Sequence, residues 1–214
     1  MGLFEGVNIS LYAAALAIGP APVVVALHLT SPIMLLLLAM RTGKRPVSVG
    51  IVVELLLLGV AITLVAGQPG ADLGSGKAVG GCALALGSAA AVTALIVLVT
   101  SASRQRDPTM SAGLQLAVAG VLTTPLLLST NWNGGRVLTE LVLGAALLGP
   151  GFALYWRAVR HLRPATVGAV GLTEAVVASA LVGVVDRSQI SMPIVLSGVL
   201  VATAVLLDIR DRSR

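Results

Sequence analysis

The sequence contains a series of long apolar segments, each close to the length that crosses a lipid bilayer. A membrane-spanning helix needs about 20 mostly apolar residues. The segments that approach this length cover residues 3 to 19, 21 to 40, 48 to 66, 79 to 100, 111 to 129, 138 to 159, 165 to 185 and 190 to 208. Short connections rich in Gly, Pro and Asn separate them. The chain is therefore predicted to be an all-α polytopic membrane protein with about eight transmembrane helices.

Composition excludes several other classes of protein. Hydrophobic residues make up 57% of the chain and charged residues only 11%, against roughly 25% charged in soluble domains. The net charge of +5 does not indicate a nucleic-acid partner, because aromatic residues are only 3% and no basic face forms. The single Cys82 excludes a disulfide framework and a thiolate metal site. No metal and no cofactor is expected, and because no catalytic motif is present the protein is not predicted to be an enzyme.

The basic residues indicate how the chain is oriented, because Lys and Arg in short loops stay on the cytoplasmic side. Eleven of the fourteen fall on one side if the eight segments alternate, and both termini are then cytoplasmic in the plasma (inner) membrane. This side holds Arg41, Lys44, Arg45, Arg104, Arg106, Arg157, Arg160, Arg163, Arg210, Arg212 and Arg214. The apolar N-terminus carries Glu5 where a signal peptide has positive charge, so we expect this segment to be retained.

The chain aligns with itself at an offset of 143 residues. Leu11 and Tyr12 match Leu154 and Tyr155, and fourteen identities occur without a gap over residues 11 to 64. The offset places the first three spans over the last three, so the predicted repeat unit has five spans. Because five is odd, the two copies have inverted topology, as in many secondary transporters.

This repeat divides the chain into a 3+5 version of a 5+5 transporter fold. Residues 1–67 form a first repeat that is incomplete at its N-terminus, and residues 68–78 form an external linker. Residues 79–209 form a complete second repeat, and residues 210–214 form a basic cytoplasmic tail.

Two stretches of the sequence resemble a known family. They are LFEGVNISLYAAALAIGPAPVVVALHLTSPIMLLLL and VLGAALLGPGFALYWRAVRHLRPATVGAVGLTEAVVASALVG. They are similar to the two halves of an EamA-domain protein of the drug/metabolite transporter superfamily, in its threonine and homoserine exporter-like branch. The resemblance implies a ten-helix, two-repeat fold that exports small metabolites such as amino acids. The sequence departs from the family at Ala175, where relatives have proline after the Glu of the LTE motif.

Ionisable residues within the apolar spans are the first candidates for function, because burying them in a bilayer is costly. They are His28, Glu54 and Glu174. The repeat aligns Glu174 with Ser31 and Thr173 with Thr30, so these four residues form a predicted substrate-binding or coupling set with His28 and Tyr155. Glu174 would bind an ammonium group, and Glu174 and His28 would exchange protons.

Prolines predict helix breaks within two of the spans. Pro32 removes a backbone hydrogen bond, and Gly149 with Pro150 does the same in the sixth span, so both would expose polar backbone to a wet central cavity.

Structural interpretations stand beside these functional ones. For Glu174 the alternative to function is a hydrogen bond across a helix interface. For His28 an interhelical donor and a cavity residue are equally expected, and the prolines are equally expected to be simple kinks. Glu54 is expected to pair with the basic loop after residue 40. Trp156, next to a basic cluster, is expected to be an interfacial anchor.

The sequence thus predicts a secondary transporter that works by alternating access. Its partners are the lipid bilayer and a small-molecule substrate, with either a homodimer or a second membrane subunit as the assembly. The alternative is a truncated, non-transporting membrane protein or a partner subunit that needs further helices. Small residues such as Ala178, Ser179 and Gly183 permit such assembly.

Overall fold

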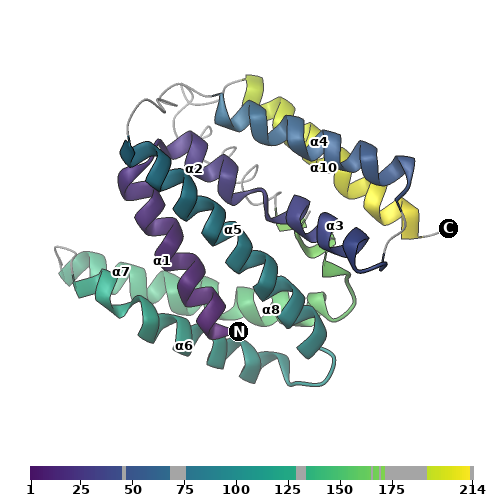
Figure 1. Cartoon of the computed structure of the whole chain (residues 1–214). Coiled ribbons are helices and arrows are strands. Elements are labelled where there is room, and N and C mark those ends of the chain that lie inside the picture. The colour runs from purple at the N-terminus through teal and green to yellow at the C-terminus, as the bar shows by residue number, and fades with distance from the viewer. Residues whose placement is uncertain are drawn as a thin grey trace.

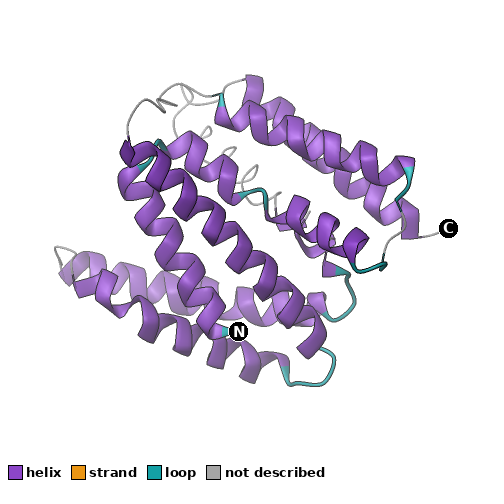
Figure 2. Cartoon of the chain, in the orientation of Figure 1, coloured by secondary structure: helices purple, strands orange, loops and turns teal. Residues whose placement is uncertain are grey.

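A computed structural model describes residues 1–44, 47–67, 76–128, 134–164, 166–168, 170–171 and 192–212. These residues form helices and no strand (Figure 2), as predicted. In chain order the elements are α1 (Gly2–Ile18), α2 (Ala21–His28), α3 (Ser31–Arg41), α4 (Val49–Ala66), α5 (Gly76–Ala102), α6 (Pro108–Leu128), α7 (Gly134–Leu143), η1 (Gly144–Leu148), α8 (Gly149–Val159) and α10 (Met192–Arg212).

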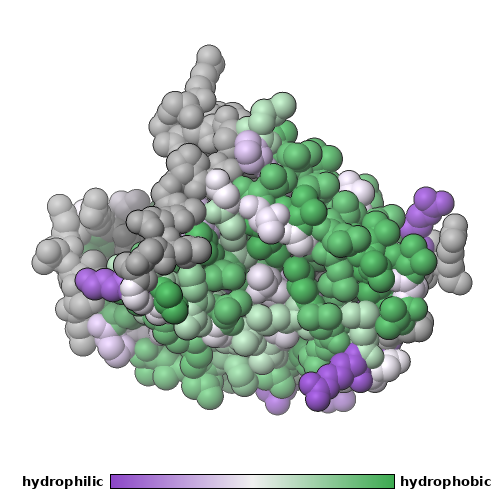
Figure 3. All heavy atoms as spheres, turned by 45° about the horizontal axis from the view of Figure 1, so that its top comes forward, coloured by the Kyte–Doolittle hydropathy of each residue, from purple (hydrophilic) through white to green (hydrophobic). Residues whose placement is uncertain are grey.

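Among the described residues, four helical stretches are long and apolar enough to cross a membrane: Ala21–Arg41, Gly76–Ala102, Pro108–Leu126 and Val137–Val159. Gly2–Ile18, Val49–Leu64 and Val195–Ala204 are shorter apolar helices. Large hydrophobic side chains also lie exposed along several of the helices, and Figure 3 shows them as a broad hydrophobic face. Such a surface is typical of a protein that faces lipid, so the chain is a membrane protein. The predicted seventh span lies largely outside the described residues, and the count of eight stays a prediction.

The helices pack in a continuous order across the molecule. The α4–α10 pair lies at one side, α2 and α3 contact α4 and α5, and α1 lies between α5 and α6, with α8 against α6 (Figure 1). The close approach of α1 and α5 depends on glycine. A Cβ at Gly81 would lie 2.6 Å from the Cα of Gly19, so a side chain there would force the two helices apart.

Two helix starts can be compared with the 143-residue offset seen in the sequence, while the repeat itself stays a prediction. α4 begins at Val49 and α10 at Met192, and the two run side by side in opposite directions (Figure 1). α2 begins at Ala21. The residue at the same offset from Ala21 is Pro164, which is the first helical residue after the loop that follows α8.

The buried positions recur at the same spacing. Leu58 and Ala61 of α4 are 0% and 3% exposed, and their counterparts Val201 and Ala204 of α10 are 5% and 0% exposed. These four residues pack together in one apolar cluster with Leu36. The α4–α10 contact is therefore built from equivalent faces of two helices.

The end of the molecule near Met1 gathers two of the basic segments that were predicted to be cytoplasmic. The guanidinium of Arg160, after α8, donates a hydrogen bond of 3.3 Å to the backbone carbonyl of Arg106, between α5 and α6. Both segments therefore lie at the same end, as the distribution of charge requires.

Candidate functional site

Helix α1 carries a polar stripe through the apolar bundle. Glu5, Asn8 and Tyr12 are spaced by three and four residues, so they share one face of the helix. Ala15, which is 0% exposed, continues this face toward α5. Sequence reasoning did not select Glu5 or Asn8 as site residues, although their spacing within an apolar helix was the signal that marks them.

The predicted site residue His28 lies against this stripe. Its Nδ1 is 2.9 Å from Oγ of Ser88 on α5, and Ser88 Oγ donates to Asn8 Oδ1 at 2.7 Å. The Tyr12 and His28 rings have centroids 4.4 Å apart. Ser88 is 0% exposed, so this set joins α1, α2 and α5 by hydrogen bonds inside the bundle.

The order of these hydrogen bonds assigns a tautomer to His28. A serine hydroxyl has a single proton, and Ser88 uses it toward Asn8. His28 Nδ1 must then donate to Ser88 Oγ, which leaves Nε2 as the nitrogen with a lone pair in the neutral ring. The imidazole thus keeps one acceptor for a substrate or a water molecule.

The helix break predicted around Pro32 is present. α2 ends at His28, and α3 begins at Ser31 with Pro32 in its first turn, where a missing amide proton is tolerated. Thr30 Oγ1 donates to the Leu27 carbonyl at 2.6 Å. Thr93 Oγ1 of α5 lies 3.4 Å from the Ser31 carbonyl and donates to its own helix at 2.8 Å. Hydroxyls therefore already cover part of the backbone at the break.

The break is also a crossing point between the two predicted repeats. A Cβ at Gly168 would lie 2.6 Å from Leu35 Cδ1 and 3.3 Å from the Cα of Pro32. The helical residues 166–168 thus pack directly on the start of α3. Thr173 and Glu174, the predicted partners of Thr30 and Ser31, lie outside the described residues.

The second predicted break differs from expectation. Pro150 is exposed, and nothing lies within 4 Å of a Cβ at Gly149. The chain passes through the π-helical turn η1, so Pro150 falls in the first turn of α8 and the helix continues. A π turn rearranges the backbone hydrogen bonds locally, and within the described residues Gly149 and Pro150 do not join His28 in a shared cavity.

A second polar group lies closer to the basic end. Trp156 Nε1 of α8 donates to Gln115 Oε1 of α6 at 3.0 Å, and Gln115 Nε2 donates to Glu5 Oε2 at 3.3 Å. Trp156 is 0%, Gln115 2% and Glu5 9% exposed. The expectation that Trp156 is an interfacial anchor is therefore wrong, because its ring fills the core and its N–H orients Gln115. Tyr155, a predicted site residue, lies within electrostatic reach of Glu5.

Glu54 occupies a different environment from these two groups. It is 1% exposed on α4, whereas Arg41 and Lys44 of the basic loop are exposed. Its counterpart at the 143-residue offset is Ser197, which is 5% exposed. The two polar residues thus share equivalent buried places on α4 and α10.

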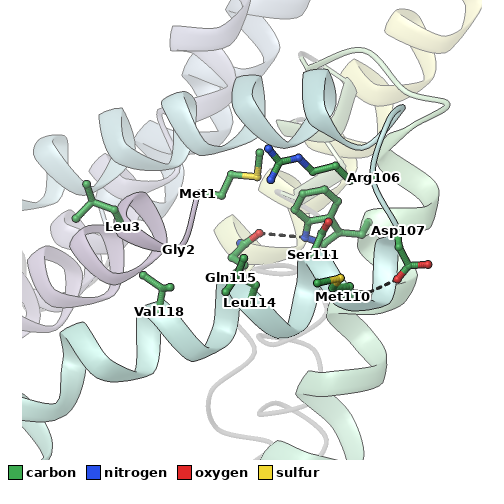
Figure 4. Close-up of a pocket in the computed structure, with 11 residues that line it drawn as sticks. Met1, Gly2, Leu3, Arg106, Asp107, Met110, Ser111, Leu114, Gln115 and Val118 are labelled. Atoms are coloured by element: carbon green, nitrogen blue, oxygen red, sulfur yellow. Dashed lines mark hydrogen bonds between the residues drawn. The ribbon is translucent and has the colours of Figure 1, made fainter.

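A pocket of about 580 Å³ opens beside the Glu5 group (Figure 4). The start of α1, the connection before α6, and one face of α6 form its wall, and Gln115 and Trp156 contribute to its lining. Arg106 and Asp107 also line it, and Asp107 Oδ1 accepts a hydrogen bond from the Met110 amide at 2.8 Å. The pocket therefore connects charged residues at the basic end with the buried amide that contacts Glu5.

Comparison with known proteins gives the fold and no more. No protein-family model and no curated protein matches the sequence. One solved structure, described only as the crystal structure of a protein, is similar with a TM-score of 0.74 at 18% identity. The match covers 97% of this chain and 72% of that chain. At this identity the likeness establishes a shared helical fold.

Proposed function

We propose that this protein is a secondary transporter that exports small metabolites such as amino acids by alternating access. The observation that carries the proposal is the polar stripe of α1. Glu5, Asn8 and Tyr12 face partners on three other helices, α6, α5 and α2, within a largely apolar bundle. Polar side chains are costly in a membrane. A bundle with only a structural role would not be expected to carry several of them along one buried helix face.

The predicted internal repeat is consistent with this proposal. The equivalent starts of α4 and α10, and the equivalent buried residues between them, are expected if two inverted repeats of a 5+5 fold pack about a pseudo-twofold axis. In such folds the substrate is bound near the bilayer midplane between the repeats. Pro32 and Leu35, which follow the break at Leu29 and Thr30, pack against Gly168, and in the proposed fold this contact would lie at such a boundary.

The chemistry of the stripe suits a zwitterionic substrate. A carboxylate on Glu5 or Glu174 would bind an ammonium group, while His28 and nearby hydroxyls would contact the other polar groups. The resemblance to EamA-domain exporters points to the same class of substrate. The common end of the basic segments around Arg106 and Arg160 supports placing that end in the cytoplasm, and we propose that both termini lie on this side of the plasma (inner) membrane.

One observation favours the alternative, a subunit that needs further helices. The stretch Val137–Val159 is apolar, and no residue in its most hydrophobic window is buried within the chain. A lipid-facing helix would have this property, and so would a helix that packs against a second subunit. The proposed transporter would then act as a homodimer or a heteromeric complex.

Export of radiolabelled amino acids tests the proposed function. Cells that express this chain, a Glu174→Gln variant, a Ser88→Ala variant or an empty vector are loaded with threonine, homoserine and a panel of small amino acids. We expect export above the vector for the unchanged chain, and reduced export for both variants at equal amounts in the membrane. Export equal to that of the vector for every substrate, alone and when co-expressed with other membrane subunits, would contradict the proposal.

A further inference from the structure

We propose that Glu5 carries the proton that is exchanged for substrate, and that Gln115 and Trp156 position its carboxyl group. This inference rests on the proposed transport function and assigns the coupling step to a carboxyl group that sequence reasoning had not selected. Its basis is the geometry of the Glu5 group and the pocket beside it.

The described residues around Glu5 do not supply a fixed countercharge. Its side chain is 9% exposed and accepts one hydrogen bond, at 3.3 Å, from the neutral amide of Gln115. Among the residues that the structure describes, no lysine, arginine or histidine side chain makes an ion pair with it. A buried carboxylate without a cation is costly, and a bound proton or the ammonium group of a substrate removes that cost. The Glu5 carboxylate can therefore bind either a proton or the ammonium group of a substrate, but not both at once.

Gln115 is held in a single orientation by Trp156. Because the indole N–H donates to Gln115 Oε1 at 3.0 Å, the amide NH₂ is directed at Glu5 Oε2. A neutral donor in this position contacts the carboxyl oxygen in both protonation states. The pair thus fixes the position of the carboxyl group without neutralising its charge.

The pocket provides a route for the proton. Gln115 and Trp156 belong both to the pocket wall and to the Glu5 group, so the amide separates the pocket from the carboxyl group. Met1, Arg106 and Asp107 lie at the same pocket, toward the predicted cytoplasmic end. In an export cycle the carboxylate binds a proton on the outer side, and that proton leaves through this pocket to the cytoplasm when the ammonium group of a substrate entering from the same end takes its place on Glu5.

Few other titratable groups face Glu5 from the elements around it. α6 has none in its sequence, and α5 has only Lys77, at its far end, and Cys82. Tyr155 of α8 is within electrostatic reach, and His28 of α2 lies at the other end of the stripe. The remaining groups are the Met1 amine, Arg106 and Asp107 at the pocket, and Arg157 and Arg160 at the end of α8.

Carbodiimide labelling tests the inference without knowledge of the substrate. Dicyclohexylcarbodiimide adds across its C=N bond to the O–H of a protonated carboxyl group in an apolar environment, and mass spectrometry locates the adduct. The full chain in native-membrane vesicles should be labelled at Glu5, and labelling should fall as the pH rises. Trp156→Phe, which removes the N–H but keeps a ring, should shift this pH dependence, whereas Glu54→Gln, a buried glutamate on α4, should not. Absence of labelling at Glu5 across pH 5 to 9 would overturn the inference.

A transport measurement separates this inference from the proposed function. Glu5→Gln should abolish the stimulation of export by an imposed pH gradient, so that the ratio of rates with and without the gradient falls to about one. Exchange of labelled for unlabelled substrate should continue, since it needs no net proton movement. Full gradient stimulation in Glu5→Gln would overturn the inference and leave the transporter proposal intact. Labelling at Glu5 without export of any substrate would support the proton site while contradicting the transporter proposal.

Discussion

The α4–α10 pair and helix α1 bury their faces in different ways. Between α4 and α10 the contact is made by Leu58, Ala61, Val201 and Ala204, which are equivalent residues of two helices. On α1 the buried face instead carries Glu5, Asn8 and Tyr12, each with a polar or aromatic partner on another helix. The first contact is sufficient to hold helices together by close packing. The second brings hydrogen-bonding groups into the bundle at a cost in stability, as expected if α1 lines the proposed transport path.

The largest effect is expected where α1 crosses α5. Gly81→Val would place side-chain atoms against the backbone of Gly19, which cannot yield as a side chain can. The cost should exceed the about 1–3 kcal/mol typical of overpacking in a core, and folded protein should be lost. Fluorescence-detected size-exclusion chromatography measures this directly. Gly80→Val is the matched control, because its Cβ would meet only the end of Ile18 at 3.5 Å; similar profiles for both variants would contradict the predicted crossing.

The next largest effect is expected at the tryptophan that supports the Glu5 group. Trp156→Ala removes a ring that is 0% exposed and should lower the free energy of unfolding by about 3–5 kcal/mol. Trp156→Phe retains most of the packing and should cost much less, although it removes the hydrogen bond to Gln115. Thermal unfolding in detergent distinguishes the two variants. Equal loss from both would mean that the hydrogen bond, and not the packing, dominates at this position.

A smaller effect is expected in the α4–α10 pair. Ala204→Leu overfills a contact in which Ala204 is 0% exposed, and should cost about 1–3 kcal/mol. Ala202→Leu on the same helix is the control, because Ala202 is exposed and should tolerate the larger side chain. Both stabilities are measured by thermal unfolding. Equal stability of the two variants would mean that Ala204 does not lie on the face of α10 that packs on α4.

The smallest effect on stability is expected within the polar stripe. Ser88→Ala removes the hydroxyl between His28 and Asn8 and should cost about 1 kcal/mol, while export should fall sharply. Ser101→Ala is the control on the same helix, because Ser101 is exposed and bonds only the Leu98 carbonyl. Export at the unchanged rate in Ser88→Ala would mean that the stripe is structural.

The sequence predicted those features that depend on local pattern. Apolar length gave the helices, Pro32 gave the break in the second span, and the charge distribution placed Arg106 and Arg160 at one end. Each of these follows from the chemistry of a short segment and needs no knowledge of which helices are neighbours.

The features that depend on tertiary contacts were not predicted. Nothing local to Trp156 shows that its N–H faces Gln115, forty-one residues earlier. Glu5 was considered only as a charge near the N-terminus, because its partner is 110 residues away. Pro150 was expected to break a helix in the interior, but the preceding π turn accommodates it on an exposed surface.

Access of water to the α1 stripe tests the central claim most directly. In a Cys82→Ala background, Asn8→Cys and Leu56→Cys are treated with a charged, membrane-impermeant thiol reagent in intact and in inverted vesicles. A thiol reacts as the thiolate, which forms only where water reaches it. We predict that Asn8→Cys reacts from at least one side. Leu56 is 62% exposed on the apolar helix α4 and is expected to face lipid, so Leu56→Cys should not react. Failure of Asn8→Cys to react from either side would contradict a transport path along α1.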